Sequence, residues 1–307
     1  MKFLQQEIVE IIETNLQESF AVWDAEKTYY VEDDEENLTS DNVARDGNFY
    51  YRTAIDENIG NNPSENEGDS WVVYRPSNRY AMLDTHAKTL TQSDEDFYIK
   101  IKRDFIELLA FGNVIADSIT IENLDAEDNV ISTQTIDTTA YNEDVDDYWS
   151  YIYSKYDSEI TRAFLVTISP IGEYLKISFT KNSIENKTQC GFLVGGQPVD
   201  FGDTLYDVNF SYNTIGDNSF DEWGRVKSDV IIPQDMTDFE TLIDAGVFAK
   251  TRTKIKNTYG KIGVFIIDES KDSKYDNLLS LARIMSTTQV LSNSSKVVLS
   301  WSIAEIL

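Results

Sequence analysis

Residues 71–84, WVVYRPSNRYAMLD, mark the point where the character of this 307-residue chain changes. Before this stretch, short aromatic runs alternate with polar segments rich in Asn, Asp, Gly and Pro, which is the composition of turns and loops. After it, one alternating apolar segment follows another. The stretch therefore separates a small N-terminal module from a longer region of β-strands, and we expect the fold to be organised around it.

The composition indicates an acidic, folded protein. The chain has 54 Asp and Glu against 26 Lys and Arg, and the net charge of −28 repels both nucleic acid and anionic membranes. Its 17 Tyr and 15 Phe argue against disorder, because disordered chains are poor in aromatic residues. No window approaches 18 apolar residues and no signal peptide is visible, so we expect synthesis in the cytoplasm and no membrane insertion.

The single cysteine and the single histidine restrict the chemistry that we expect. Cys190 cannot form an intramolecular disulfide, and we interpret it as a small apolar residue in a strand. His86 lies in a polar stretch typical of a solvated loop and has no second histidine for a zinc site. No phosphate-binding loop or nucleophile elbow is present. We therefore predict no cofactor, no metal and no catalytic residue.

The chain divides into four predicted segments. Residues 1–19 carry apolar side chains at helical spacing and are expected to form an amphipathic helix, which packs on the next domain or docks on a partner subunit. Residues 20–85 are expected to form a small aromatic-rich β module. Residues 86–204 contain six alternating runs, typical of an antiparallel β-sandwich of the jelly-roll or galactose-binding-like type. These runs are residues 97–101, 118–121, 130–136, 163–168, 174–179 and 190–196.

Residues 205–307 are expected to form an α+β domain, which makes the whole chain mainly β with an α+β C-terminal unit. The predicted helices are residues 236–250, preceded by Pro233 and by Asp235 as a cap, and residues 275–285. The predicted strands are residues 206–212, 225–232, 263–268 and 296–306.

Five aromatic residues of the module are candidates for stacking on sugar rings: Trp23, Tyr50, Tyr51, Trp71 and Tyr74. The alternative is that they form the core of the module, because so small a unit needs large aromatic side chains to bury enough area. We expect the core role for at least three of the five.

Acidic residues are too numerous to nominate a site. Residues 32–36, 125–129 and 143–147 carry the hard oxygen ligands that calcium prefers, but a solvated acidic face is the favoured interpretation. A glycosidase needs two carboxylates at a fixed separation, and 54 acidic residues do not single out such a pair.

The module resembles the small chitin-binding module that accompanies secreted glycosidases. Trp23, Tyr29, residues 46–52 (DGNFYYR) and Trp71 follow its order of aromatic residues, over about 50 residues. The chain departs from that pattern through the acidic insertion at residues 32–45.

Residues 20–307 as a whole look like a group of bacteriophage tail proteins that begin with such a module. The family signature Pro-Thr-Asn-Arg-Trp-Ala-Met-Phe-Asp corresponds here to residues 76–84, PSNRYAMLD. A Gly-containing strand at residues 192–196 and the stretch SFDEWG at residues 219–224 follow in the family's order. An N-terminal helix would be a departure, since the family begins with an extended segment.

The resemblance implies a non-enzymatic structural protein of the virion tail, located at the tail tip, the baseplate or a fibre attachment. Its implied partners are copies of itself in a symmetric oligomer and other tail proteins, with host polysaccharide as a candidate ligand. The alternatives are a carbohydrate-binding adhesin and, less favoured, a glycan hydrolase. Within the signature, Arg79 and Asp84 are expected to form an ion pair that fixes the linker after the module, and Pro76 favours an extended Arg75.

Overall fold

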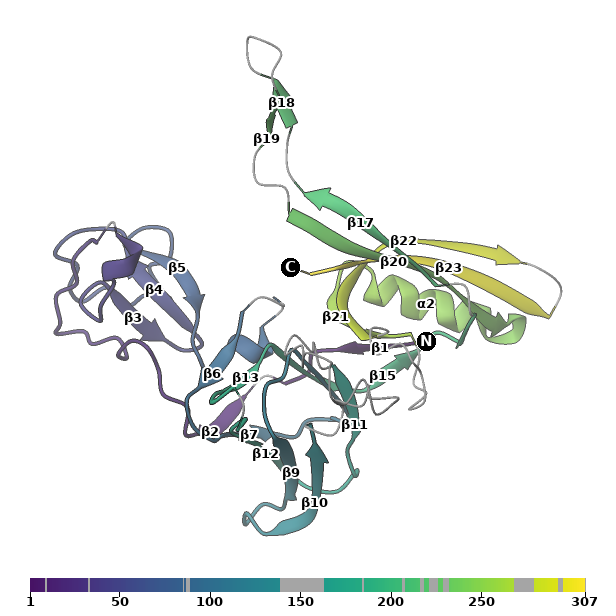
Figure 1. Ribbon diagram of the computed structural model, residues 1–307, viewed down its shortest axis with the longest axis horizontal. Helices are drawn as coiled ribbons and strands as arrows, with labels where there is room; N and C mark the ends of the chain where they lie inside the picture. The colour runs from purple at the N-terminus through teal and green to yellow at the C-terminus, as the bar shows by residue number, and fades with distance from the viewer. Residues whose placement is uncertain are drawn as a thin grey trace, which may run out of the picture.

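The computed structural model is mainly β, with several antiparallel sheets and a short C-terminal helix (Figure 1). It describes residues 1–8, 10–32, 34–84, 86, 89–138, 163–183, 185–205, 208–215, 218–220, 226–228, 232–267, 279–291 and 295–306. None of the helices in these ranges is both long and apolar enough to cross a membrane. Figure 1 shows a small module beside a strand-rich central unit, and a sheet of long strands that carries the helix.

The small module is a three-stranded antiparallel sheet with long connecting loops. Its strands are β3 (Val43–Asp46), β4 (Phe49–Thr53) and β5 (Trp71–Pro76), and one loop contains the short 3₁₀-helix η1 (Glu35–Asn37). The core is aromatic, because Trp71 packs edge-on against Tyr29 with ring centroids 5.0 Å apart. Both rings also use their polar atoms: the Trp71 indole donates to Asn61 O, and the Tyr29 hydroxyl accepts from Asp24 N–H.

The central unit contains two larger sheets and a two-stranded ribbon. The five-stranded sheet has the order β10 (Val130–Asp137), β9 (Ser118–Leu124), β12 (Tyr174–Thr180), β7 (Phe97–Lys102), β2 (Ile11–Thr14). The three-stranded sheet has the order β11 (Phe164–Thr167), β8 (Leu108–Gly112), β14 (Phe192–Gly196), and β6 (Thr91–Ser93) pairs with β13 (Thr188–Cys190). All six strand predictions between residues 97 and 196 are confirmed, with the last divided between β13 and β14 at Gly191.

One apolar core joins these two sheets. Phe97 and Phe179 stack at 4.5 Å within the five-stranded sheet, and Phe111 of the three-stranded sheet meets Phe179 edge-on at 6.2 Å. Cys190 is buried in the same core, as expected, and this burial raises the pKa of its thiol.

The third sheet has eight strands and includes both ends of the described chain. Its order is β15 (Pro198–Asp200), β1 (Lys2–Gln5), β21 (Ile262–Ile266), β22 (Leu279–Leu291), β23 (Lys296–Glu305), β20 (Ile232–Asp244), β16 (Asp203–Thr204), and β17 (Asn209–Ile215) also pairs with β20. The helix α2 (Phe248–Thr258), which follows η3 (Ala245–Val247), packs on one face through Ile255. β15 and β16 belong to this sheet although they precede residue 205, where the sequence suggested a boundary.

The prediction of an N-terminal helix at residues 1–19 is wrong, because this segment forms two strands. Phe3 and Leu4 of β1 are both fully buried but lie on opposite faces of the eight-stranded sheet, in two different apolar clusters. A strand buried on both faces does not alternate between apolar and polar residues, so its spacing is compatible with a helix. The second strand, β2, joins the sheet of the central unit.

The two helices predicted in the C-terminal unit are also wrong. Residues 236–244 belong to β20, in which Thr237, Phe239, Thr241 and Ile243 are buried in alternation, and the helix begins only at Phe248. Residues 279–285 of the second predicted helix belong to β22, and residues 275–278 lie outside the described residues. In both segments, pairing with distant strands overrides a weak local helical pattern.

Candidate functional site

The structure buries three of the five candidate stacking residues. Trp71, Tyr50 and Tyr51 are at most 6% exposed, and their faces cannot meet a ligand in this fold. Trp23 and Tyr74 are half-buried, and Trp23 packs against the aromatic core. The expectation that at least three of these residues form the core is confirmed, which leaves Tyr74 as the candidate beside an open surface.

A shallow groove of about 620 Å³ runs beside β5 and includes Tyr74. Its apolar wall consists of Val31, Val72, Val73 and Tyr74, and Glu35 and Arg52 supply charges. Val72 and Val73 are 53% and 38% exposed, because β5 pairs only with β4 among the described strands. The groove therefore combines a partly exposed aromatic ring with hydrogen-bonding groups of both signs, which is suited to a polar ligand with an apolar face.

Arg79 does not form the predicted ion pair with Asp84. Its Nε lies 3.7 Å from Glu18 Oε1, and its Nη2 donates to Gly47 O at 2.9 Å. Burial, and then the like charge of Arg45, lower the pKa of Arg79. The pair with Glu18 connects the segment that precedes the module with the segment that follows it.

Asp84 instead accepts hydrogen bonds from within its own loop. Its carboxylate accepts from Thr89 Oγ1 at 2.7 Å and from the His86 backbone N–H at 2.8 Å. Burial raises the pKa of Asp84, and these hydrogen bonds oppose that shift. The exposed His86 agrees with the solvated loop expected at this position.

Asn78 is the residue of this signature that sequence analysis overlooked. Its backbone N–H donates to Glu18 Oε2 at 3.0 Å, and its side-chain amide donates to Gln17 O at 3.0 Å and Gln92 O at 2.8 Å. Its Oδ1 also accepts from the Gln92 backbone N–H at 2.9 Å. A single side chain thus joins three segments, which is a contact that no local pattern indicates.

The acidic runs do not form a metal site in the part of the chain that the structure describes, where no group of three or more metal-ligating side chains is found. In residues 125–129, Asp125 accepts from the backbone N–H of Glu127 and Asn129, and Asp128 pairs with Lys100 at 2.5 Å. Residues 34–36 lie at η1, and residues 143–147 are outside the described residues.

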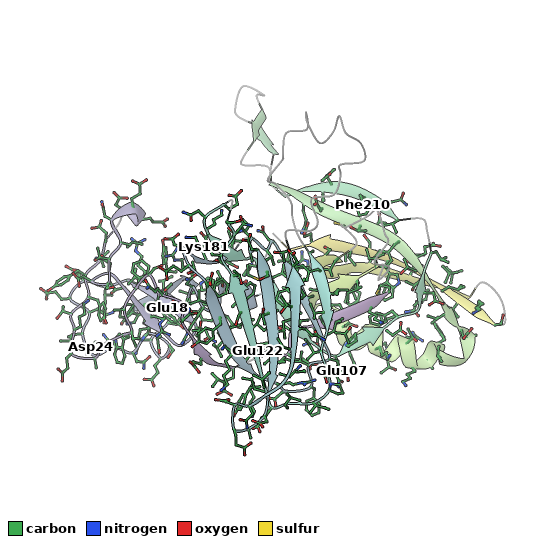
Figure 2. The ribbon with its side chains drawn as sticks, turned by 60° about the horizontal axis from the view of Figure 1, so that its bottom comes forward. Glu18, Asp24, Glu107, Glu122, Lys181 and Phe210 are labelled. Atoms are coloured by element: carbon green, nitrogen blue, oxygen red, sulfur yellow. The ribbon has the colours of Figure 1, made fainter. Side chains whose placement is uncertain are left out.

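A second candidate surface lies on β17 and β20 of the eight-stranded sheet, and the ribbon β18 (Asn218–Phe220)–β19 (Val226–Ser228) comes between these two strands in the sequence (Figure 1). We call the paired part of β17 and β20, residues 209–213 and 234–238, the arm. Phe210 and Tyr212 are 57% and 77% exposed, and they alternate along β17, so they lie on one face. Figure 2 shows Phe210 at the opposite end of the molecule from Glu18, which lies beside the module.

The same face of the arm carries two neighbouring carboxyl groups. Tyr212 is opposite Asp235 on β20, and Asp235 adjoins Glu305 near the end of β23. Burial and the charge of Asp235 raise the pKa of Glu305 to about 7. Neither carboxyl lines the groove beside β5.

A second groove, of about 610 Å³, lies between α2 and β22. It is lined by Arg252, Ile255, Lys256, Tyr259 and residues 287–289. The helix contains Lys250, Arg252, Lys254 and Lys256 but no acidic residue. This groove is therefore a cationic surface on a strongly acidic chain.

No protein-family model matches this sequence, and no curated protein or solved structure is significantly similar to it.

Proposed function

We propose that this chain is a non-enzymatic structural protein of a bacteriophage tail, at the tail tip, the baseplate or a fibre attachment, and that it assembles into a symmetric oligomer. The observation that carries the proposal is the arm. On this edge of the eight-stranded sheet, Phe210 and Tyr212 are more than half exposed and offer apolar side chains that a partner would cover. The resemblance of the signature at residues 76–84 to tail proteins supplies the class of particle.

The packing of the eight-stranded sheet against the central unit also supports a structural role in a particle. The eight-stranded sheet shares an apolar core with the central unit, in which Leu4 and Val264 meet Phe192 and Val194. Each of these two units therefore supports the other. In this proposal the central unit is a β-sandwich formed around the core that joins its two larger sheets, and Arg79 and Asp84 stabilise the linker to a chitin-binding-like module.

The proposal is tested first by mass photometry of the purified full chain. We expect a defined oligomer at micromolar concentration, and we expect antibodies against the chain to label the tail in electron micrographs of purified virions. A strict monomer that is also absent from purified virions would overturn the proposal.

A second function, carbohydrate binding at the host surface, is favoured by the groove beside β5. Tyr74 is the candidate stacking residue that this groove contains, and Arg52 and Glu35 are placed to bind hydroxyl groups. We expect Tyr74→Ala to abolish binding on a glycan array. Tyr30→Ala is the matched control, because Tyr30 is 47% exposed but does not line the groove. Unchanged binding to the glycan array, and unchanged adsorption of virions to host cells, after Tyr74→Ala would overturn the carbohydrate-binding function and leave the structural role intact.

A further inference from the structure

The helix α2 is positively charged, whereas the chain as a whole is strongly negative. The whole sequence has a net charge of −28, yet the 11 residues of α2 include four cations and no anion. Clusters of basic residues on an acidic protein are favourable places for an acidic partner, because the opposite potentials steer the two surfaces together.

The cations of this helix divide into those engaged within the chain and those that face outward. Lys254 donates to Asp200 O at 3.4 Å. Arg252 and Lys256 are exposed on the groove, and no carboxylate among the described residues lies within ion-pair distance of either. Ile255 is buried beneath this groove, and the half-exposed ring of Tyr259 is accessible beside the cations, so the groove offers both charge and apolar contact.

The arm has the complementary chemistry. Phe210 and Tyr212 project from one face of β17, and Asp235 lies directly across from Tyr212 on the same face. Glu305 adds a second carboxyl beside Asp235. Aromatic side chains next to acidic groups are suited to a groove that contains a half-exposed tyrosine and two exposed cations.

We propose that the arm of one copy of this chain docks in the α2 groove of the next copy. Phe210 and Tyr212 would cover Tyr259 and the aliphatic stems of the two cations, and Asp235 would pair with Arg252 or Lys256. This inference rests on the proposed structural function and identifies the two surfaces through which the copies meet.

We assign this contact a head-to-tail arrangement, in which the arm of each copy enters the groove of the next, because repetition of such a contact builds the symmetric oligomer of the proposed function. In an open row of copies, a contact of this kind leaves a free arm at one end and a free groove at the other. The copies form a ring when the rotation between neighbours brings these two ends together. The contact also predicts how damaged copies combine. One copy with a damaged arm and one copy with a damaged groove retain between them a single intact contact.

The test uses two double variants of the full chain. Phe210→Ser with Tyr212→Ser removes the arm's apolar contacts, and Arg252→Glu with Lys256→Glu reverses the charge of the groove. We expect each variant alone to be monomeric, with self-association weakened at least about tenfold. Mixed at equal concentration, they should form a 1:1 dimer and nothing larger in mass photometry.

The matched control is Lys250→Glu, which changes the same helix at an exposed position outside the groove. It should leave the mass distribution of the wild type unchanged, and far-UV circular dichroism should show that all variants remain folded. An oligomer that persists in both double variants, or double variants that remain monomers when mixed, would overturn the arm–groove contact while the structural function stands. A strictly monomeric wild type absent from virions would instead overturn both proposals.

Discussion

The molecule uses aromatic residues in two opposite ways. In the N-terminal module, Tyr50 and Trp71 are 1% and 0% exposed and use their polar atoms inside the fold. On the arm, Phe210 and Tyr212 are 57% and 77% exposed. The richer cluster of aromatic residues is therefore core, and the sparser one is surface.

The difference follows from what lies on each side of the strands. The module has a small sheet and long loops, so its large rings must supply most of the apolar area that holds it together. On the arm, β17 pairs with β20 at an edge of the eight-stranded sheet, and residues 209–213 of β17 are exposed along their whole length. An aromatic residue on such a strand contributes little to folding and is available for a partner.

The largest effect should come from Trp71→Ala. The change removes a fully buried indole, its contact with Tyr29 and its hydrogen bond to Asn61 O, and we expect a loss of about 3–5 kcal/mol in the free energy of unfolding. Denaturant titration, with hydrogen exchange to localise the loss to residues 20–76, measures it. Val73→Ala on the same strand is the control and should cost about 1 kcal/mol or less, because Val73 is 38% exposed. Equal losses for the two variants would contradict the core role.

A matched pair of Tyr→Phe changes separates the two regions next. The Tyr50 hydroxyl bonds Glu18 and accepts from Ser19 N–H at 2.8 Å, so Tyr50→Phe removes two hydrogen bonds made by a buried side chain and should cost about 1–3 kcal/mol. Tyr212→Phe removes an exposed hydroxyl and should change stability by less than about 0.5 kcal/mol. Thermal unfolding of the two variants and the wild type measures both losses of stability. A loss for Tyr212→Phe as large as that for Tyr50→Phe would contradict the contrast between the two regions.

The same contrast explains what sequence analysis could and could not predict. Strands with one buried face, such as β9 and β12, alternate visibly and were predicted. β1 is buried on both faces and β20 is paired over its length with β23, so their burial is decided by distant segments. The candidate site shows the same limit. The aromatic residues of the module were identifiable, but Asn78 and the α2 groove depend on contacts between segments far apart in the sequence.

The pH dependence of stability gives an effect of intermediate size at the root of the arm. The pKa of Glu305 is about 7 in the folded state, against an ordinary value of 4.5, so the folded state binds the extra proton between these pH values. The contribution of Glu305 to the free energy of unfolding therefore decreases as the pH rises from about 4.5 to 7. Because Glu305 is partly solvated, we expect a decrease of about 1–2 kcal/mol. The difference in stability between the wild type and Glu305→Gln, measured by urea unfolding from pH 5 to pH 8, should show this slope, and a constant difference would contradict the carboxyl pair.

The smallest effect on the stability of an isolated copy should come from the arm itself. Phe210→Ser with Tyr212→Ser removes two large apolar side chains, yet both are more than half exposed, so we expect a change of less than about 0.5 kcal/mol at concentrations where the wild type is monomeric. Because the apolar area of these two rings is already in contact with water, its removal costs the folded copy little. Stability that is insensitive to the double variant, together with self-association that depends on it, is the combination expected of side chains retained for a partner. A loss of several kcal/mol in the monomer would instead place Phe210 and Tyr212 in the same class as Tyr50 and Trp71.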